Sequence, residues 1–377
     1  MKNLYLFLLL VILNVNISFS KNLRTLAECQ DYTFFATEEN VKIIGRTYKK
    51  EDETWIVHGG AAVEFYAVGN TVELFLVGDD SIYEDPDFRP RYAIYVDDKM
   101  VIDTTMSNLE FTAQFKISND ENAKSKIKVM MLSEAQNGGI GIKAIKINSC
   151  LENRKIWPVE KKPYSIEFIG DSITNAYGVD APDQSHPFKT TTENFSKSYA
   201  YLASEMVGAD YSSVSYSGHG IVSGYSGGDK WADGLVPLYY EKISKNTKYP
   251  GDWDFENHKY DVVLINLGTN DANYVNADRE TRKNEFVQEY VNFLKTVRAK
   301  NPSAYILCTL GTLNPKDMYP LVEEAVKLFA EERTSVFLSP TQDMNDGLGA
   351  DWHPSKITHQ KLAKLVAEKI SEVLNKK

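Results

Sequence analysis

Four short polar segments of this chain carry the groups that acyl transfer requires. They are GDS at residues 170–172, SGHG at 217–220, GTND at 268–271 and DWHP at 351–354. Together they supply two serine hydroxyls, two histidines and the side-chain amide of Asn270. A serine is a weak nucleophile until a neighbouring base takes its proton, and the tetrahedral intermediate needs hydrogen-bond donors that are already in place. These residue types indicate a serine hydrolase, provided that the fold brings the four segments together.

The first segment by itself has a second interpretation. Gly170 follows the apolar run YSIEFI, and glycine permits a tight turn at the end of a strand. Asp171 and Ser172 are both residue types that favour helix N-caps, so the triplet also fits a turn that only caps a helix. The other segments have to decide between the two interpretations.

The second half of the chain predicts a parallel sheet that would join these segments. Strand-like apolar runs alternate with helical patterns such as those of residues 280–300 and 356–374. This alternation is typical of a three-layer α/β domain, in which helices cover both faces of a parallel sheet. The first three polar segments each follow a predicted strand, and ligands bind beyond the carboxyl ends of such strands. The DWHP segment precedes the last helix, so we expect His353 at the same edge.

The first half of the chain has a different pattern. From about residue 40 to residue 147, apolar and polar residues alternate in short runs that end in Gly, Asn or Asp. This pattern predicts an all-β antiparallel sandwich or jelly roll. We therefore expect a jelly-roll domain at residues 30–150, a polar linker at 151–163 and a catalytic domain at 164–377.

The N-terminus predicts export. A lysine at position 2, an apolar run over residues 4–13 and the small residues Ser18 and Ser20 are typical of a signal peptide at residues 1–20. The run is shorter than the roughly 20 apolar residues that span a bilayer. We therefore expect a secreted, extracellular protein without a membrane segment.

Cysteine content and charge narrow the classes of cofactor and partner. An exported protein permits disulfides, and Cys29 and Cys150 bracket the sandwich, so we expect these two to pair. Cys308 lies in the apolar run AYILCTL and is expected to be a buried free thiol.

The sequence contains no Cys-x-x-Cys or His-rich motif, so we expect no metal and no cofactor. The net charge of −10 argues against nucleic-acid binding, and we expect a monomer.

The polar segments also resemble a known family. GDSIT, SGHG, GTND and DWHP, in this order, resemble the four sequence blocks of the SGNH (GDSL-like) hydrolases. The segments TWIVHGGAAVEFYAVGNTVELFL, RYAIYVDD and LSEAQNGGIGIKAIKI look like the N-terminal jelly roll of carbohydrate esterase family 2, whose members are acetyl esterases on plant polysaccharides. The resemblance implies that Ser172 is the nucleophile and His353 the base. It also implies an oxyanion hole formed by the backbone N–H groups of Ser172 and Gly218 and the side chain of Asn270.

The sequence departs from the broad SGNH pattern at the third member of the catalytic triad. That superfamily usually places an Asp three residues before the His, and here the position is Ala350. Family 2 esterases often work as a Ser-His dyad in which a backbone carbonyl orients the imidazole. A carbonyl fixes the tautomer, although it stabilises imidazolium less than a carboxylate does. We expect a dyad, with Asp351 as the minor alternative.

An acetylated polysaccharide such as xylan or glucomannan is the substrate that the resemblance implies. Trp352, beside His353, is a candidate wall on which a sugar ring stacks. Tyr177 and His219 are further candidate substrate contacts, although His219 equally fits an exposed loop position. Two alternatives stay open: an SGNH lipase or thioesterase, which would need a wide apolar groove, and a carbohydrate-binding protein without activity.

Overall fold

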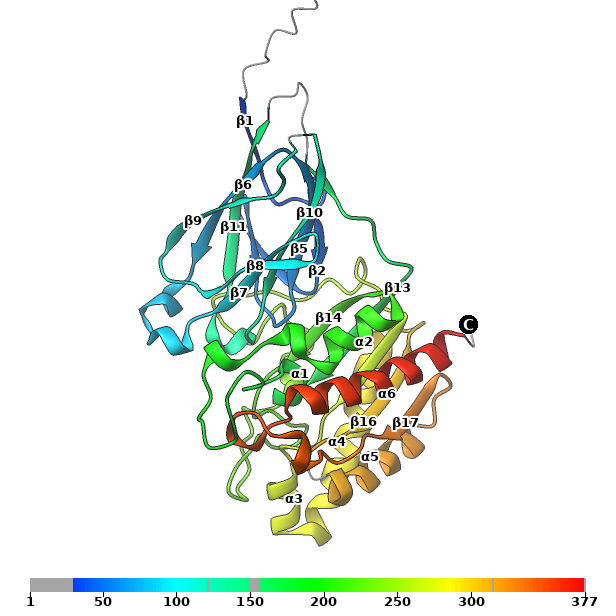
Figure 1. The fold of residues 1–377 in the computed structure, drawn as a ribbon. Coiled ribbons are helices and arrows are strands. Elements are labelled where there is room, and N and C mark those ends of the chain that lie inside the picture. Colours follow the sequence, from blue (N-terminus) through cyan, green and yellow to red (C-terminus); the bar gives the residue numbers. More distant parts are fainter. Residues whose placement is uncertain (1–29, 121, 150–155, 314, 376–377) are drawn as a thin grey trace, which may run out of the picture.

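The computed structural model describes residues 30–120, 122–149, 156–313 and 315–375 (Figure 1). Within these residues the chain forms a β sandwich followed by an α/β unit, and Figure 1 shows the sandwich seated on one end of that unit. The predicted signal peptide and the predicted Cys29–Cys150 pair lie outside the described residues. Cys308 is a free, buried thiol, as predicted. In the described part of the chain, no helix combines the length and apolar character needed to cross a membrane.

The sandwich consists of two antiparallel sheets. One has the order β3-β4-β11-β6-β9, with β1 paired to the second half of β11, and the other has the order β12-β5-β10-β7-β8, with β2 paired to β5. The strands are β1 (Gln30–Phe34), β2 (Lys42–Ile44), β3 (Thr47–Lys50), β4 (Glu53–Ile56), β5 (Ala62–Val68), β6 (Thr71–Gly78), β7 (Arg91–Val96), β8 (Lys99–Thr105), β9 (Glu110–Lys116), β10 (Lys124–Met131), β11 (Ile140–Ser149) and β12 (Trp157–Pro158).

Period-two alternation forms the core of the sandwich, because successive side chains of a strand point to opposite faces. In β6, Val72, Leu74 and Leu76 are buried, whereas the residues between them are half-buried. The buried residues join one cluster with Ile127 and Val129 of the second sheet. The predicted antiparallel sandwich is confirmed. Part of the predicted linker nevertheless completes it, because β12 pairs with β5.

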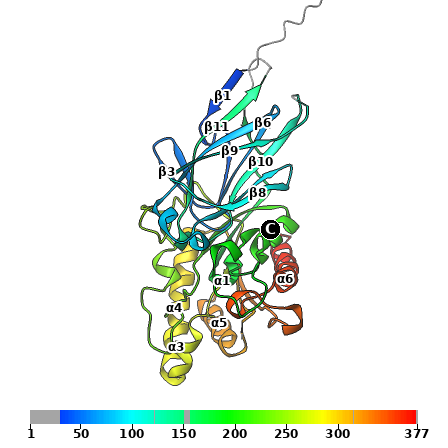
Figure 2. The ribbon, with the colours of Figure 1, turned by 60° about the vertical axis from the view of Figure 1, so that its left-hand side comes forward.

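The α/β unit has a five-stranded parallel sheet with the order β14-β13-β15-β16-β17. Helices α2 and α6 cover one face and share a buried cluster with it, and α4 and α5 cover the other. Figure 2 shows α6 and α4 on opposite sides of the unit. This confirms the predicted three-layer arrangement. Its strands are β13 (Tyr164–Gly170), β14 (Ala209–Ser215), β15 (Val262–Asn266), β16 (Tyr305–Leu310) and β17 (Thr334–Leu338), and its helices are α1 (Ser172–Asn175), α2 (Tyr199–Val207), α3 (Ala272–Ala277), α4 (Arg279–Lys300), α5 (Pro315–Phe329) and α6 (Lys356–Leu374).

A buried ion pair connects the sandwich to the α/β unit. Arg46, between β2 and β3, donates to Glu167 of β13 over 2.9 Å, and both side chains are fully buried. Tyr240 donates to the second oxygen of Glu167, and the Arg46 guanidinium also bonds the backbone carbonyls of Tyr240 and Lys242. A buried charge is tolerated only when it is paired and hydrogen-bonded. The ion pair thus joins the two parts of the molecule through a buried hydrogen-bond network that leaves only the Nε of the Arg46 guanidinium without a partner.

Candidate active site

Ser172 is positioned by the turn between β13 and α1. Asp171 caps the helix, since its carboxylate accepts from the backbone N–H of Ile173 over 2.9 Å. A side chain at position 170 would bring its Cβ to 2.0 Å from Oγ1 of Thr174, so only glycine fits this turn. The capping interpretation of the sequence is therefore correct for Asp171, and the same turn presents Ser172 at the carboxyl edge of the sheet.

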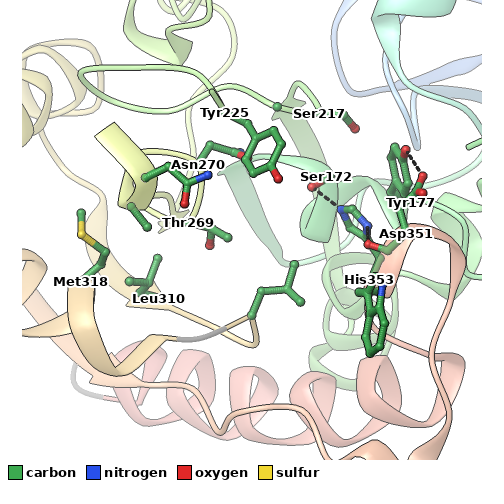
Figure 3. A pocket seen from close by; sticks show the side chains of 15 residues that line it. Ser172, Tyr177, Ser217, Tyr225, Thr269, Asn270, Leu310, Met318, Asp351 and His353 are labelled. Atoms are coloured by element: carbon green, nitrogen blue, oxygen red, sulfur yellow. Dashed lines mark hydrogen bonds between the residues drawn. The ribbon is translucent and has the colours of Figure 1, made fainter. Parts of the chain in front are cut away.

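His353 faces Ser172 across this edge (Figure 3). Its Nε2 lies 2.9 Å from the Ser172 Oγ, and its Nδ1 lies 3.1 Å and 3.2 Å from the backbone carbonyls of Ala350 and Asp351. Carbonyl oxygens only accept, so Nδ1 carries the proton and Nε2 accepts from the serine hydroxyl. Burial lowers the pKa of His353 to about 4, which keeps the imidazole neutral near pH 7. Tyr177 stacks on the ring at a centroid distance of 4.0 Å.

The carboxylate of Asp351 is occupied elsewhere. Its Oδ2 accepts from the Tyr177 hydroxyl over 2.8 Å and from the backbone N–H of Phe188 over 3.1 Å. Asp351 and Trp352 both adopt positive φ, at 48° and 67°, a region that costs non-glycine residues about 1–3 kcal/mol each. This turn points two backbone carbonyls at His353 and turns the Asp351 carboxylate towards Tyr177.

We expect Asp351→Asn to change kcat/KM less than about tenfold, far below the roughly 10⁴-fold loss that removal of a triad carboxylate causes. The amide oxygen can still accept from Tyr177 and Phe188, so the turn that orients His353 is retained. Steady-state kinetics on a small aryl acetate measure the effect. Asp343→Asn, in the exposed segment before this turn, is the matched control. A 10⁴-fold fall in kcat with the fold intact would make Asp351 the third catalytic member.

Two of the predicted oxyanion donors lie around the same cavity as Ser172. Gly218 and Asn270 both line it, and Gly218 has a φ of 78°, which favours glycine at the turn that presents its N–H. The amide of Asn270 is anchored to the His219 carbonyl over 2.9 Å. Its contact with the Asp171 carboxylate is much longer, at 3.4 Å. The Asn270 amide is therefore held in place while part of its donor capacity remains for a reacting oxygen.

His219 does not join these residues, and its position corrects both alternatives, the predicted substrate contact and the exposed loop position. The side chain is fully buried and is absent from the lining of the cavity. Its Nε2 accepts from the Lys245 ammonium over 2.8 Å, so Nδ1 carries the proton and donates to the Ser217 carbonyl over 3.0 Å. Burial lowers its pKa to about 4. His219 thus supports the turn that carries Gly218 from behind.

The cavity itself has a volume of about 730 Å³. Tyr177 and Trp352, both predicted, line it, and the Trp352 side chain is 56% exposed. The lining also contains residues that the sequence did not predict, namely the exposed Tyr225 and an apolar end formed by Leu310, Leu313 and Met318. Tyr225 and Leu313 lie in loops, Leu310 ends β16 and Met318 lies in α5. They share no motif, so no local pattern marks them.

Glu134 of the sandwich was also missed. It lies just before η3 (Ala135–Asn137), and its side chain is buried against the α/β unit. Its carboxylate accepts from the backbone N–H of Ser217 over 2.8 Å and from the Asn175 amide over 3.1 Å. The sandwich therefore holds the turn that bears Gly218. In the sequence, Glu134 is part of LSEAQNGG, and nothing local separates it from an ordinary surface acid.

The fold and this constellation indicate an ester hydrolase. A sequence model of the GDSL-like lipase/acylhydrolase family matches residues 168–361. The chain belongs to this family and is a carboxylic ester hydrolase, as the four polar segments predicted.

Relatives of known name support a closer grouping. An acetylxylan esterase / glucomannan deacetylase of Cellvibrio japonicus is 22% identical over 91% of this chain and 92% of its own length. The cellulase/esterase CelE of Acetivibrio thermocellus is 35% identical over 58% of this chain, but the match spans only 26% of that longer protein.

Solved structures share the two-part fold. The acetyl xylan esterase Est2A of Butyrivibrio proteoclasticus has a TM-score of 0.82 at 22% identity, over 92% of this chain and 99% of its own. A family two carbohydrate esterase of Clostridium thermocellum, solved in complex with cellohexaose, has a TM-score of 0.76 at 25% identity, over 89% of this chain and 99% of its own. The chain thus has the fold of the family 2 carbohydrate esterases, which its sequence resembled.

Proposed function

We propose that this protein is a secreted carbohydrate O-acetyl esterase that removes acetyl groups from plant polysaccharides with a Ser172–His353 dyad. The observation that carries the proposal is the 2.9 Å contact between His353 Nε2 and Ser172 Oγ, with Nδ1 oriented by backbone carbonyls. The names of the curated relatives support the substrate class, since two of them are acetylxylan esterases / glucomannan deacetylases.

The geometry supports a two-step acyl transfer. The Ser172 Oγ attacks the acetyl carbonyl carbon while its proton passes to Nε2 of His353. The N–H groups of Ser172 and Gly218 and the Asn270 amide stabilise the oxyanion. When the intermediate collapses, the sugar oxygen leaves and takes the proton from Nε2, and acetyl-Ser172 remains. Water, deprotonated by His353, then attacks this ester, and acetate and the free serine are released.

Exposed aromatic rings supply a surface for the sugar. Trp352 and Tyr225 line the cavity and are 56% and 66% exposed. Flat rings of this kind stack on the apolar faces of other rings and still offer a polar edge. An acetylated pyranose that lies between them would present its ester to Ser172.

A second candidate is an esterase for longer acyl chains. The apolar end formed by Leu310, Leu313 and Met318 is the observation that favours it. Each methylene that such a surface buries adds about 0.8 kcal/mol of binding, close to fourfold. If this end receives the acyl chain, kcat/KM rises roughly fifteenfold from acetyl to butyryl esters.

We expect the opposite trend, a steep fall of kcat/KM from acetyl through butyryl to octanoyl aryl esters, together with acetate release from acetylated xylan or glucomannan. In parallel, Trp352→Ala is expected to weaken hydrolysis of sugar acetates more than that of aryl acetates, because only the sugar needs the indole. Initial rates on the ester series, with acetate assayed enzymatically, measure both effects. Faster hydrolysis of octanoyl than of acetyl esters would replace this proposal by the second candidate.

A further inference from the structure

A second cavity, of about 460 Å³, lies on the sandwich near its contact with the α/β unit. Its walls come from η1 (Asp80–Tyr83) and η2 (Pro86–Phe88), which follow β6, and from η3 (Ala135–Asn137). The lining residues are Asp80, Ser81, Tyr83, Glu84, Phe88, Gln136, Asn137 and Lys248. Only Lys248 belongs to the α/β unit.

This cavity adjoins the active-site cavity at two places. On one side, Gln136 donates to the backbone carbonyl of Ser217 over 3.1 Å, and Ser217 lines the active-site cavity. On the other side, Phe88 contacts Phe188 at a ring-centroid distance of 6.4 Å. Phe188 in turn stacks on Tyr177 at 4.4 Å, and Tyr177 also lines the active-site cavity. The two cavities are thus linked directly through Gln136 and Ser217, and indirectly through Phe188 between Phe88 and Tyr177.

The segment that carries the aromatic residues is held in place. The Asp87 carboxylate pairs with Lys189 over 2.5 Å, and the Asp87 backbone carbonyl accepts from Thr190 over 2.8 Å. Tyr83 is 72% exposed and Phe88 is 42% exposed. Among the residues that the structure describes, Tyr83 has no hydrogen-bond or ring partner. A large aromatic ring of the second cavity is therefore presented to solvent on an anchored segment.

The chemistry of this cavity suits a neutral, hydroxyl-rich ligand. Asp80, Glu84 and Asn137 offer oxygen acceptors and an amide donor, and an ion pair with Asp80 engages Lys248. The Gln136 amide is already bonded to Glu134, Ser217 and Lys245. Carboxylates and amides bond hydroxyl groups, whereas the acidic lining disfavours a phosphate or another anion. Exposed aromatic faces next to such groups are the surface on which a pyranose ring lies.

We propose that this second cavity binds pyranose units of the same polysaccharide chain, beyond the unit whose ester is cleaved, with Tyr83 as the stacking residue. The proposal rests on the proposed function for the nature of the ligand. It assigns the sandwich a direct share in recognition of long substrates, because Tyr83 lines the second cavity and is absent from the lining of the active-site cavity.

The first test is kinetic. Two values of kcat/KM are compared, one for an acetylated xylo-hexasaccharide and one for an aryl acetate. In Tyr83→Ala, the ratio of the first to the second is expected to fall roughly three- to tenfold, because KM for the hexasaccharide rises while kcat stays the same. Tyr83→Phe keeps the flat ring and should retain most of the ratio. Phe35→Ala, which removes another exposed aromatic side chain of the sandwich, should leave it unchanged. An unchanged ratio in Tyr83→Ala, or equal losses on both substrates, would overturn the proposal.

The second test uses binding and separates this proposal from the proposed function. Titration calorimetry with unacetylated xylohexaose or cellohexaose is carried out on the Ser172→Ala protein, with and without Tyr83→Ala. If the double variant binds either hexasaccharide more weakly than Ser172→Ala does, the second cavity is supported, even if the wild-type protein hydrolyses no sugar acetate. Equal binding, or no binding by either protein, overturns it.

Discussion

Ser172→Ala and His353→Ala are each expected to lower kcat by a factor on the order of 10⁵, because the two groups act as one unit in proton transfer and attack. For the same reason the double variant should be little slower than either single variant, instead of showing the product of the two losses. Esterase assays with a sensitive aryl acetate, on protein purified apart from the wild type, measure the rates.

The control for this result is that each variant keeps its fold. Alanine at position 172 removes one buried hydroxyl, so the thermal unfolding temperature and near-ultraviolet circular dichroism should match those of the wild type. Substantial turnover by Ser172→Ala, with contamination excluded, is incompatible with Ser172 as the nucleophile. An additive loss in the double variant would likewise contradict the dyad.

Arg46→Ala is expected to lower the free energy of unfolding by about 3–5 kcal/mol, because it leaves the buried Glu167 carboxylate without its charge partner. The guanidinium also lies over the rings of Tyr240, Trp253 and Phe255, at 5.2–5.3 Å from their centroids, and that packing is lost as well. Urea titration monitored by tryptophan fluorescence measures the change.

Two further variants make this prediction specific to burial. The pair between Lys126 and Asp98 is more exposed, so Lys126→Ala should cost no more than about 1 kcal/mol. The double variant Arg46→Met with Glu167→Met removes both buried charges and should be less destabilised than Arg46→Ala. If Arg46→Ala costs no more than Lys126→Ala, the buried pair does not stabilise the junction between the two parts.

Local patterns in the sequence predicted the elements that position the site. The apolar run at 164–170 and the amphipathic pattern at 356–374 coincide with β13 and α6, because burial on a sheet or along one helix face dictates each periodicity. Gly170 and the positions of the polar segments, after predicted strands or before the last helix, then predicted that Ser172 and His353 lie at one edge of the sheet. The Ser172–His353 contact was predictable for that reason.

Contacts that form only between distant segments were not predictable in this way. Whether His219 faces the substrate or the protein interior depends on Lys245, which lies 2.8 Å from its Nε2 and 26 residues away in the sequence. Two other features likewise depend on how separate elements pack: the apolar end at Leu310 and Met318, and the hydrogen bond from Ser217 to Glu134. Periodicity describes each element alone and carries no information on such packing.

The contacts of Glu134 and Arg46 have a consequence for how such enzymes can be recombined. A chimera that joins residues 164–377 to the sandwich of another esterase inherits Glu167 and the Ser217 N–H, but not the partners that satisfy them. Unless the donor sandwich brings an arginine and a carboxylate to these two points, the hybrid contains a buried lone charge and a loosened turn at Gly218. The sandwich and the α/β unit therefore depend on each other's side chains. A graft between homologues should keep both the Arg46–Glu167 pair and the Glu134–Ser217 hydrogen bond.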